Sequence, residues 1–415
     1  MLNANRKSFA NFEKIILYYP WPAEKIVISK KALAQCGDFL LKKSWKKLLI
    51  IADQNTFAAC GEALIPYISG DIEKIIYEEL SADIEEAKIL ATKLSPYDAV
   101  IAIGSGSVSD LCKYASFLAK KPYVMVGTAP SMNGYLSQNA SLWQNGCKIT
   151  CNAHGPSALF FDTQTLANSP RRLISSGVAD LLCFSTCYID WFLSHKVLGT
   201  NFLESSFSDL RPVKNIIIEN IQAIKERNED AIAYLMLALL ISGNSMVLAK
   251  GSYPASQGEH LIAHAYDMLN PQKSINWFHG ESIAITSIYM AKLQKKLLSQ
   301  KIPAKINFYS DEKAKSFLSA FFPASTCDSC AEEYQKKFEH HESIEQLQSN
   351  LNNNWQEIIS AWQRDGISTT ILKNIFLKLE IPTNPSDLGW MEEKFSDACS
   401  LAPLIRSRFT FLDLA

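Results

Sequence analysis

The chain has 415 residues. A single hydrophobic core usually organises a shorter chain than this, so we expect two domains. With 47% hydrophobic and 20% charged residues, its composition is typical of a globular protein. The formal net charge of −1 gives no electrostatic reason to expect a nucleic acid or an anionic membrane as partner. The longest apolar run, AIAYLMLALLI from Ala231, is about half of what spans a bilayer, and it predicts a buried helix.

The N-terminal sequence MLNANRKSFANFEKIILYYP has no long apolar stretch, so we expect no signal peptide. Ten cysteines are scattered along the chain without the spacing of a disulfide framework. Reduced thiols in the cytoplasm fit this pattern best. Cys327 and Cys330 form one CxxC pair, which we interpret as structural, with a redox or zinc role as the alternative.

The first part of the chain alternates between strand and helix patterns. Apolar runs predict strands at 46–53, 72–80, 97–106 and 122–130, and helical spacing predicts helices at 54–68, 81–94 and 107–121. Ser81 is the expected N-cap of the second of these helices. The pair Asn145-Gly146 between β-like flanks predicts a hairpin. Strands separated by helices indicate βαβ units and a parallel sheet.

From about Pro170 onward, long stretches repeat their apolar residues with the period of a helix. We therefore expect an α/β, Rossmann-like N-terminal domain with a parallel sheet over residues 1–168, followed by an all-α C-terminal domain over residues 169–415. In such folds a ligand binds at the carboxyl ends of the strands, next to the domain junction.

A run of small residues, Gly104 to Ser107, lies between a predicted strand and a predicted helix. Small residues let the backbone approach a pyrophosphate, and the helix N-terminus offers free N–H groups. Because the third glycine of the usual fingerprint is replaced, a tight strand-to-helix turn remains the alternative. Asp53 ends an earlier strand, where its carboxylate could bind a ribose 2′-hydroxyl and repel a 2′-phosphate. Alternatively, Asp53 caps the next helix.

Three of the seven histidines, His260, His264 and His279, lie between Gln257 and Ser282. His260 and His264 are four residues apart, so they would share one face of a helix. The glutamate that follows the first histidine of a metalloprotease helix is absent. From these residues alone, metal ligation and packing in a core both remain open.

Five segments occur in one order along the chain: GSGSVSDLCKY, GTAPSMNGYLSQNASL, SGVADLL, SYPASQGEHLIAH and HGESIAI. Together they resemble the sn-glycerol-1-phosphate dehydrogenases, a family within the superfamily of iron-type alcohol dehydrogenases, glycerol dehydrogenase and 3-dehydroquinate synthase. The resemblance covers roughly residues 25–300. Five ordered motifs are far more specific than any one of them.

This resemblance implies an NAD- and metal-dependent oxidoreductase that interconverts dihydroxyacetone phosphate and sn-glycerol 1-phosphate, or a related small polyol. The divalent metal, zinc with nickel or iron as alternatives, would be bound by Asp180, His260 and His279. His264 would lie on the substrate side, where it could supply the alcohol proton. The NAD contacts would fall on Asp53, Gly104, Ser105, Gly106, Ser107, Asp110, Thr128 and Ser131.

Several positions depart from the family pattern around the substrate. Asn133-Gly134 stands where the family usually has Asp-Gly on the substrate's hydroxyls, so Asn133 is the candidate substrate-contacting residue. Tyr253 replaces an expected arginine, and the residues after Asp180 lack the family's Gly-Lys-Tyr. Gln257-Gly258 also replaces the usual Gly-Ser before the Glu-His pair. Lys113 is a candidate cofactor-side or phosphate-binding lysine, with a structural role as the alternative.

Two other functions compete with this interpretation. A 3-dehydroquinate-synthase-like lyase also uses NAD and a metal, but it needs a glutamate metal ligand and several basic residues for its substrate. Asp180 at the ligand position and the sparse basic residues near the motifs argue against this lyase. A non-catalytic relative that binds nucleotide or metal is the second alternative. For partners, we expect a small polyol or polyol phosphate as substrate, no nucleic acid and no membrane span, with a homo-oligomer as one option.

Overall fold

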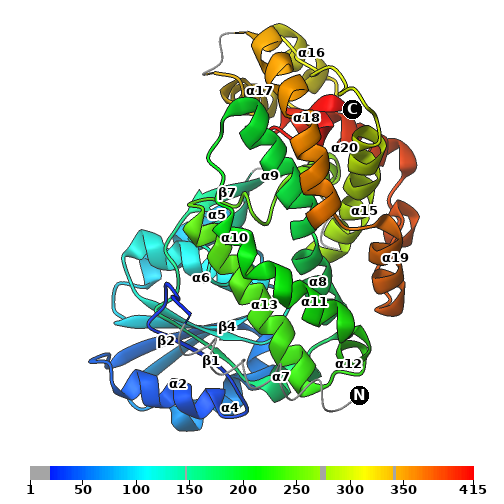
Figure 1. Cartoon of the computed structure of the whole chain (residues 1–415). Coiled ribbons are helices and arrows are strands. Elements are labelled where there is room, and N and C mark those ends of the chain that lie inside the picture. Colours follow the sequence, from blue (N-terminus) through cyan, green and yellow to red (C-terminus); the bar gives the residue numbers. More distant parts are fainter. Residues whose placement is uncertain (1–18, 145–146, 272–276, 340–342) are drawn as a thin grey trace. The chain divides into compact units, whose positions relative to one another are not determined.

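The computed structural model describes residues 19–415 except 145–146, 272–276 and 340–342 (Figure 1). The chain divides into two compact units. The first runs up to Leu181 and includes residues 210–248, and the second comprises residues 182–209 and 249–415. The domain boundary expected at residue 168 stays a prediction.

The first unit contains a six-stranded parallel sheet with the strand order β1-β8-β5-β4-β2-β3 (Figure 1). Its strands are β1 (Lys25–Ile28), β2 (Lys47–Asp53), β3 (Asp71–Tyr77), β4 (Ala99–Gly104), β5 (Tyr123–Gly127) and β8 (Ala158–Phe161). The central strands are continuous apolar runs because helices cover both faces of such a sheet. This sheet confirms the predicted fold class and the four predicted strands, whereas the sequence analysis did not predict β1 and β8.

Helices alternate with these strands and also follow the last of them. They are α2 (Ala32–Leu41), α3 (Gln54–Thr56), α4 (Glu62–Leu64), α5 (Ile84–Lys93), α6 (Gly106–Ala119), α7 (Thr163–Asn168), α8 (Arg171–Leu182), α11 (Leu210–Glu219), α12 (Ile221–Lys225) and α13 (Glu229–Leu248). A π-helical turn, Phe57–Gly61, and a 3-10 turn, Ile65–Tyr67, interrupt the helix expected at 54–68. The predicted cap at Ser81 is wrong, because the side chain of Asp83 accepts the N–H of Glu85 at the start of α5.

A separate two-stranded hairpin consists of β6 (Asn139–Gln144) and β7 (Cys147–Asn152), which pair antiparallel. The Asn145-Gly146 turn predicted to join them lies outside the described residues.

The second unit is helical throughout its described part, as predicted. Its α-helices are α9 (Phe184–Leu198), α10 (Ser205–Ser208), α14 (Gly258–Leu269), α15 (His279–Leu298), α16 (Asp311–Ser319), α17 (Ala324–Lys336), α18 (Ile344–Asp365), α19 (Thr369–Lys378) and α20 (Glu392–Leu401). Short 3-10 turns follow at Pro385–Leu388, Ala402–Leu404 and Phe411–Leu414. The helix α9 packs against both α18 and α14 and so lies at the centre of this unit.

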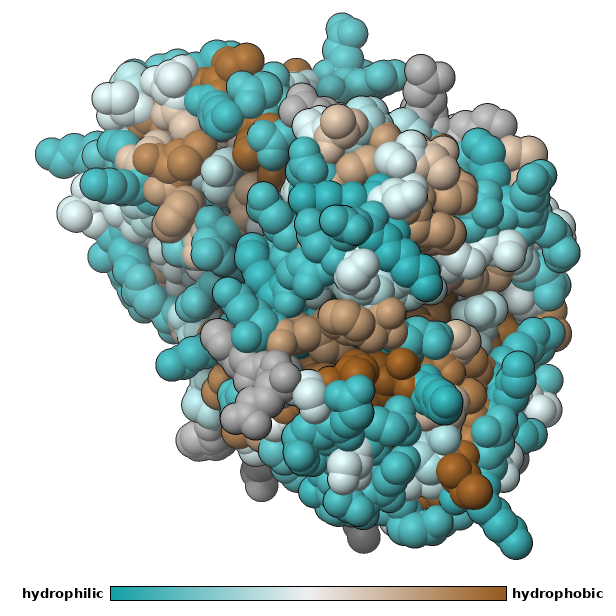
Figure 2. Space-filling model, turned by 90° about the horizontal axis from the view of Figure 1, so that it is seen from above, coloured by the Kyte–Doolittle hydropathy of each residue, from teal (hydrophilic) through white to brown (hydrophobic). Residues whose placement is uncertain are grey.

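Two helical stretches, Arg171–Leu198 and Glu229–Leu248, are long and apolar enough to cross a membrane by length and composition. In the most apolar 18-residue window of each, 94% and 89% of the residues are buried, respectively, as expected for core helices, and the second contains the buried helix predicted from Ala231. On the face shown in Figure 2, hydrophilic residues predominate and hydrophobic ones occur in separate groups. All nine cysteines that the structure describes are free thiols, Cys327 and Cys330 among them.

Candidate metal centre and cofactor site

The predicted phosphate loop lies at the carboxyl edge of the sheet in the first unit. β4 ends at Gly104, and α6 begins two residues later at Gly106. A Cβ atom at Gly104 would approach the Val108 side chain to 2.5 Å, so only glycine allows the helix to start this close to the strand. Ser105 makes no side-chain cap at this helix start. The geometry therefore suits the approach of a phosphate to the first turn of α6.

The loop after β5 lies beside the phosphate loop. Thr128 donates its N–H to the carbonyl oxygen of Gly104 at 2.9 Å, and both Thr128 and Ser131 are buried. Farther along, Asn133 donates its N–H to Oδ2 of Asp180 at 2.8 Å. The structure therefore brings the candidate cofactor loop, Asn133 and Asp180 together within the first unit.

A close approach between α8 and this loop fixes their separation. A Cβ atom at Gly177 would come within 1.8 Å of the carbonyl oxygen of Pro130. Gly177 is one helical turn before Asp180 and is therefore the position where the helix touches the loop backbone. Glycine at 177 therefore allows the hydrogen bond from Asn133 to Asp180.

Asp53 has a structural role in addition to its candidate cofactor role. Its Oδ1 atom accepts the N–H of Thr56 at 2.9 Å, and the hydroxyl of Thr56 accepts the N–H of Asp53 at 3.1 Å. Asp53 is thus the N-cap of α3, which confirms the capping alternative. Since Ala52 pairs with Ile103 in the neighbouring strand, Asp53 also lies at the same sheet edge as Gly104. The two roles are compatible.

Lys113 is fully buried and has four oxygen partners in the first unit. Its Nζ donates to the carbonyl oxygens of Gly134 (2.8 Å) and Asn139 (3.1 Å), to Oγ of Ser137 (3.3 Å), and to the carboxylate of Asp110 (3.2 Å). These contacts fix the loop after Asn133, so the structure supports the structural alternative for this lysine.

The three histidines of the predicted metal segment gather in the second unit. His260 and His264 come from α14, and His279 is the first residue of α15. The Nε2 atoms of His260 and His279 are 3.2 Å apart. Two nitrogens bound to one tetrahedral zinc at 2.0–2.1 Å would be separated by about 3.3 Å. The pair therefore has the spacing of two ligands on one ion. The ring of His264 lies 6.3 Å from that of His279, nearly parallel to it.

Glu259, directly before His260, is fully buried. Its Oε1 lies 2.8 Å from Nδ1 of His260. Burial raises the pKa of Glu259, but hydrogen bonds from His260, Cys187 and the Gln257 backbone lower it to about 2. Burial and the charge of Glu259 raise the pKa of the neighbouring Asp190 to about 8. At neutral pH the negative charge of this cluster therefore resides on Glu259.

The loop before α14 has a partner that the sequence analysis missed. Arg408, in the C-terminal segment, donates to Oγ of Ser252 (2.7 Å) and to the carbonyl oxygen of Ser256 (2.5 Å). Its guanidinium lies 4.5 Å from the ring centroid of Tyr253. The guanidinium of Arg408 thus lies beside position 253, where the family pattern led us to expect an arginine. No short sequence pattern links these residues, because more than 150 positions separate Arg408 from Ser252.

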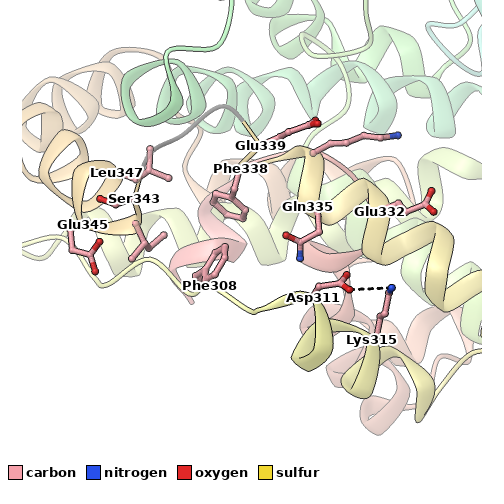
Figure 3. Close-up of a pocket in the computed structure, with 12 residues that line it drawn as sticks. Phe308, Asp311, Lys315, Glu332, Gln335, Phe338, Glu339, Ser343, Glu345 and Leu347 are labelled. Carbon is pink, nitrogen blue, oxygen red and sulfur yellow. Dashed lines mark ion pairs between the residues drawn. The ribbon is translucent and has the colours of Figure 1, made fainter.

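Another part of the second unit contains a cavity of about 850 Å³ (Figure 3). Phe308 and Phe338 line one side of it, and the ion pair between Asp311 and Lys315 lies on another. None of the described lining residues is a histidine or cysteine. We therefore do not assign the candidate metal centre to this cavity.

Comparison with known proteins places these features in context. Residues 27–170 match the family model described as iron-containing alcohol dehydrogenase. A glycerol-1-phosphate dehydrogenase [NAD(P)+] from Geobacillus thermodenitrificans is 31% identical over 283 residues, covering 65% of this chain and 69% of the relative. Its counterpart from Methanospirillum hungatei is 34% identical, covering 52% of this chain and 59% of the relative. The chain thus spans less than two thirds of the length of the Methanospirillum hungatei relative.

Solved structures share the architecture. A probable glycerol dehydrogenase from Sinorhizobium meliloti aligns with a TM-score of 0.62 at 15% identity, covering 94% of each chain. An NADH-dependent butanol dehydrogenase from Thermotoga maritima aligns with a TM-score of 0.62 at 14% identity, covering 93% of this chain and 91% of the other. At these identities the likeness establishes the fold.

Proposed function

Because the chain belongs to the glycerol-1-phosphate dehydrogenase family, we propose that it is an NAD- and metal-dependent oxidoreductase of that activity. Its reaction would interconvert dihydroxyacetone phosphate and sn-glycerol 1-phosphate, or a closely related small polyol. The observation that carries the proposal is the pair of Nε2 atoms of His260 and His279 at 3.2 Å, the spacing of two ligands on one ion.

We propose Asp180 as the third ligand, which gives the set of two imidazoles and one carboxylate found in catalytic zinc sites. Zinc is the metal we favour, with nickel or iron as alternatives. A divalent ion there would polarise the ketone oxygen, and the bound nicotinamide would supply the hydride. His264 would donate the proton that the product hydroxyl needs. Asn133 would contact the substrate's hydroxyls.

The NAD contacts proposed are the loop residues Gly104, Ser105, Gly106, Ser107 and Asp110 and the neighbouring Thr128, Ser131 and Asp53. They all belong to the first unit. We also propose a cytoplasmic location, because the nine described cysteines are free thiols.

A steady-state assay with NADH and a panel of ketones tests this function. We expect dihydroxyacetone phosphate to be reduced, and the product to be the sn-glycerol 1-phosphate enantiomer. Conversion of a carboxylate-phosphate substrate without net consumption of NADH would favour the lyase instead. No turnover of any ketone, together with retained binding of NADH, would favour the non-catalytic alternative.

Asp53→Asn should reduce the preference for NADH over NADPH. The names of the curated relatives include both cofactors, whereas we propose that the Asp53 carboxylate repels a 2′-phosphate. The amide keeps an oxygen that can accept the N–H of Thr56, so the cap of α3 survives while the charge is lost. We expect the ratio of kcat/KM values for the two cofactors to fall about tenfold, or about 1.4 kcal/mol.

Thr56→Val is the matched control, because it removes the other half of the cap and leaves the carboxylate. Its cofactor ratio should equal that of the parent. An unchanged ratio in Asp53→Asn, or a parent that prefers NADPH, would show that Asp53 does not face the adenosine ribose.

Asn133→Asp should raise activity on glycerol-type alcohols about tenfold, since charged hydrogen bonds are roughly twice as strong as neutral ones. The Asn133 side chain is buried, and its Nδ2 has no hydrogen-bond partner among the described residues. Metal and NAD affinities should change little. If turnover on every polyol is unchanged or lower, Asn133 does not contact the substrate.

A further inference from the structure

We propose that Glu259 is a positioning residue for the metal centre: it fixes the tautomer and the orientation of His260. This inference rests on the proposed function, in which His260 binds the ion. Metal-binding histidines usually donate their second ring N–H to a carboxylate or carbonyl, and such partners raise metal affinity.

The carboxylate of Glu259 is held by four donors. Oε1 accepts the backbone N–H of Gln257 (2.8 Å), the thiol of Cys187 (2.9 Å) and Nδ1 of His260 (2.8 Å). Oε2 accepts the hydroxyl of Thr186 at 2.9 Å. The backbone N–H of Gln257 can only donate, so Oε1 is an acceptor, and Nδ1 of His260 carries the proton in its hydrogen bond to the same oxygen. The lone pair of the neutral imidazole then resides on Nε2, the atom that faces His279.

The helices around Glu259 make this arrangement rigid. Thr186 and Cys187 lie on α9, the helix against which α14 packs. The backbone N–H of Gly258 bonds to the carboxylate of Asp190, also on α9, at 3.0 Å. A Cβ atom at Gly258 would come within 2.8 Å of that carboxylate and 2.4 Å of Met290 on α15, so glycine allows α14 to start here. His260, in the first turn of α14, therefore has a fixed position, and its hydrogen bond to Glu259 fixes the proton on Nδ1.

The residues around Glu259 could alternatively form a second metal site. One ligand atom each from Cys183, Cys187, Glu259 and His260 lies within 4.8 Å of the others, which is close enough to hold a metal ion. However, both Glu259 oxygens already accept hydrogen bonds, and Nδ1 of His260 is the donor in one of them. The hydrogen bonds therefore favour a network that orients His260 over a site that binds a second ion.

Glu259→Gln tests the inference in the full-length protein, with zinc affinity measured by chelator competition. The amide keeps the size of the side chain but removes its negative charge, so its hydrogen bond with Nδ1 of His260 becomes a weaker, neutral one. We expect the dissociation constant for zinc to rise about 10–100-fold, the usual effect of losing such a partner. Thr186→Val removes only one donor to the carboxylate and should give a smaller rise.

Asp190→Asn is the matched control. Asp190 is another fully buried acidic side chain that contacts the start of α14, and it also accepts from Gln294 on α15, but no histidine among the described residues bonds to it. If Glu259 acts by general support of the fold, Asp190→Asn should weaken zinc binding equally. We expect Asp190→Asn to lower the melting temperature and to retain the parent affinity for zinc.

His260→Ala, measured in parallel, separates the inference from the function on which it rests. If His260→Ala binds zinc like the parent, the proposed metal centre is wrong. If His260→Ala loses zinc while Glu259→Gln and Thr186→Val bind it as tightly as the parent, the metal centre stands and the role of Glu259 is wrong. Two zinc ions per parent chain, one of them lost in Cys187→Ser, would also overturn the inference, because the cluster would then be a metal site.

Discussion

His260→Ala is expected to yield a protein without bound metal and without measurable turnover. The substitution removes one of the two imidazoles whose Nε2 atoms lie 3.2 Å apart. A divalent ion stabilises the developing charge on a carbonyl oxygen by several kcal/mol. A loss of about 4 kcal/mol corresponds to about a thousandfold in rate, so kcat/KM should fall at least that far. Metal content after desalting and the rate of NADH oxidation are the two measurements.

His264→Ala is the control from the same helix and the same cluster of rings. Its ring lies 6.1 Å from that of His260, and we propose it as a proton donor, not as a ligand. The variant should therefore retain the metal and lose part of its turnover. Equal metal loss in both variants would contradict the assignment of His260 as the ligand and His264 as its neighbour.

Gly177→Ala should strongly destabilise the first unit and weaken NAD binding. The new methyl group would need the space of the Pro130 carbonyl oxygen, 1.8 Å from the ideal Cβ position. Overpacking of this kind costs about 1–3 kcal/mol, and more where backbone must move. The displaced loop contains Thr128 and Ser131, so we expect the dissociation constant for NADH to rise as the melting temperature falls.

Gly155→Ala provides a matched comparison for that variant. The nearest atom to its ideal Cβ is the carbonyl oxygen of Leu136 at 3.5 Å, an ordinary contact. It should therefore change neither stability nor NADH affinity appreciably. If Gly177→Ala behaves like Gly155→Ala, the close approach of α8 to the loop is not required, and our account of how Asn133 and Asp180 are held together fails.

Local sequence was sufficient to predict the central strands of the sheet, but not β1 and β8 at one of its edges. The strands β2, β4 and β5 are continuous apolar runs bounded by turn residues, and such runs are recognisable without tertiary context. The strands β1 and β8 have four residues each, KIVI and ALFF. Runs that short do not distinguish a strand from a piece of buried helix, so only pairing within the sheet defines them.

In the candidate site, too, the sequence predicted some residue roles and missed others that depend on tertiary contacts. The order of the motifs located His260 and His279 as candidate ligands and placed Gly104 at a strand end. It did not reveal the acceptor role of Glu259, because the orientation of that side chain also depends on Thr186 and Cys187 of α9, which are 73 and 72 positions away in the sequence. Asp53 was predictable both as a cap and as a cofactor contact. The structure confirms the cap and leaves the cofactor contact a prediction.

The most direct test of the account is NADH-dependent reduction of dihydroxyacetone phosphate by the metal-free protein before and after zinc is restored. We expect the chelated protein to be inactive, and activity to rise in proportion to added zinc until about one ion per chain is bound. Nickel or iron restoring more activity than zinc would change the metal but keep the mechanism. Full activity in the chelated protein, or none after any of the three metals is restored, would contradict a metal-dependent glycerol-1-phosphate dehydrogenase.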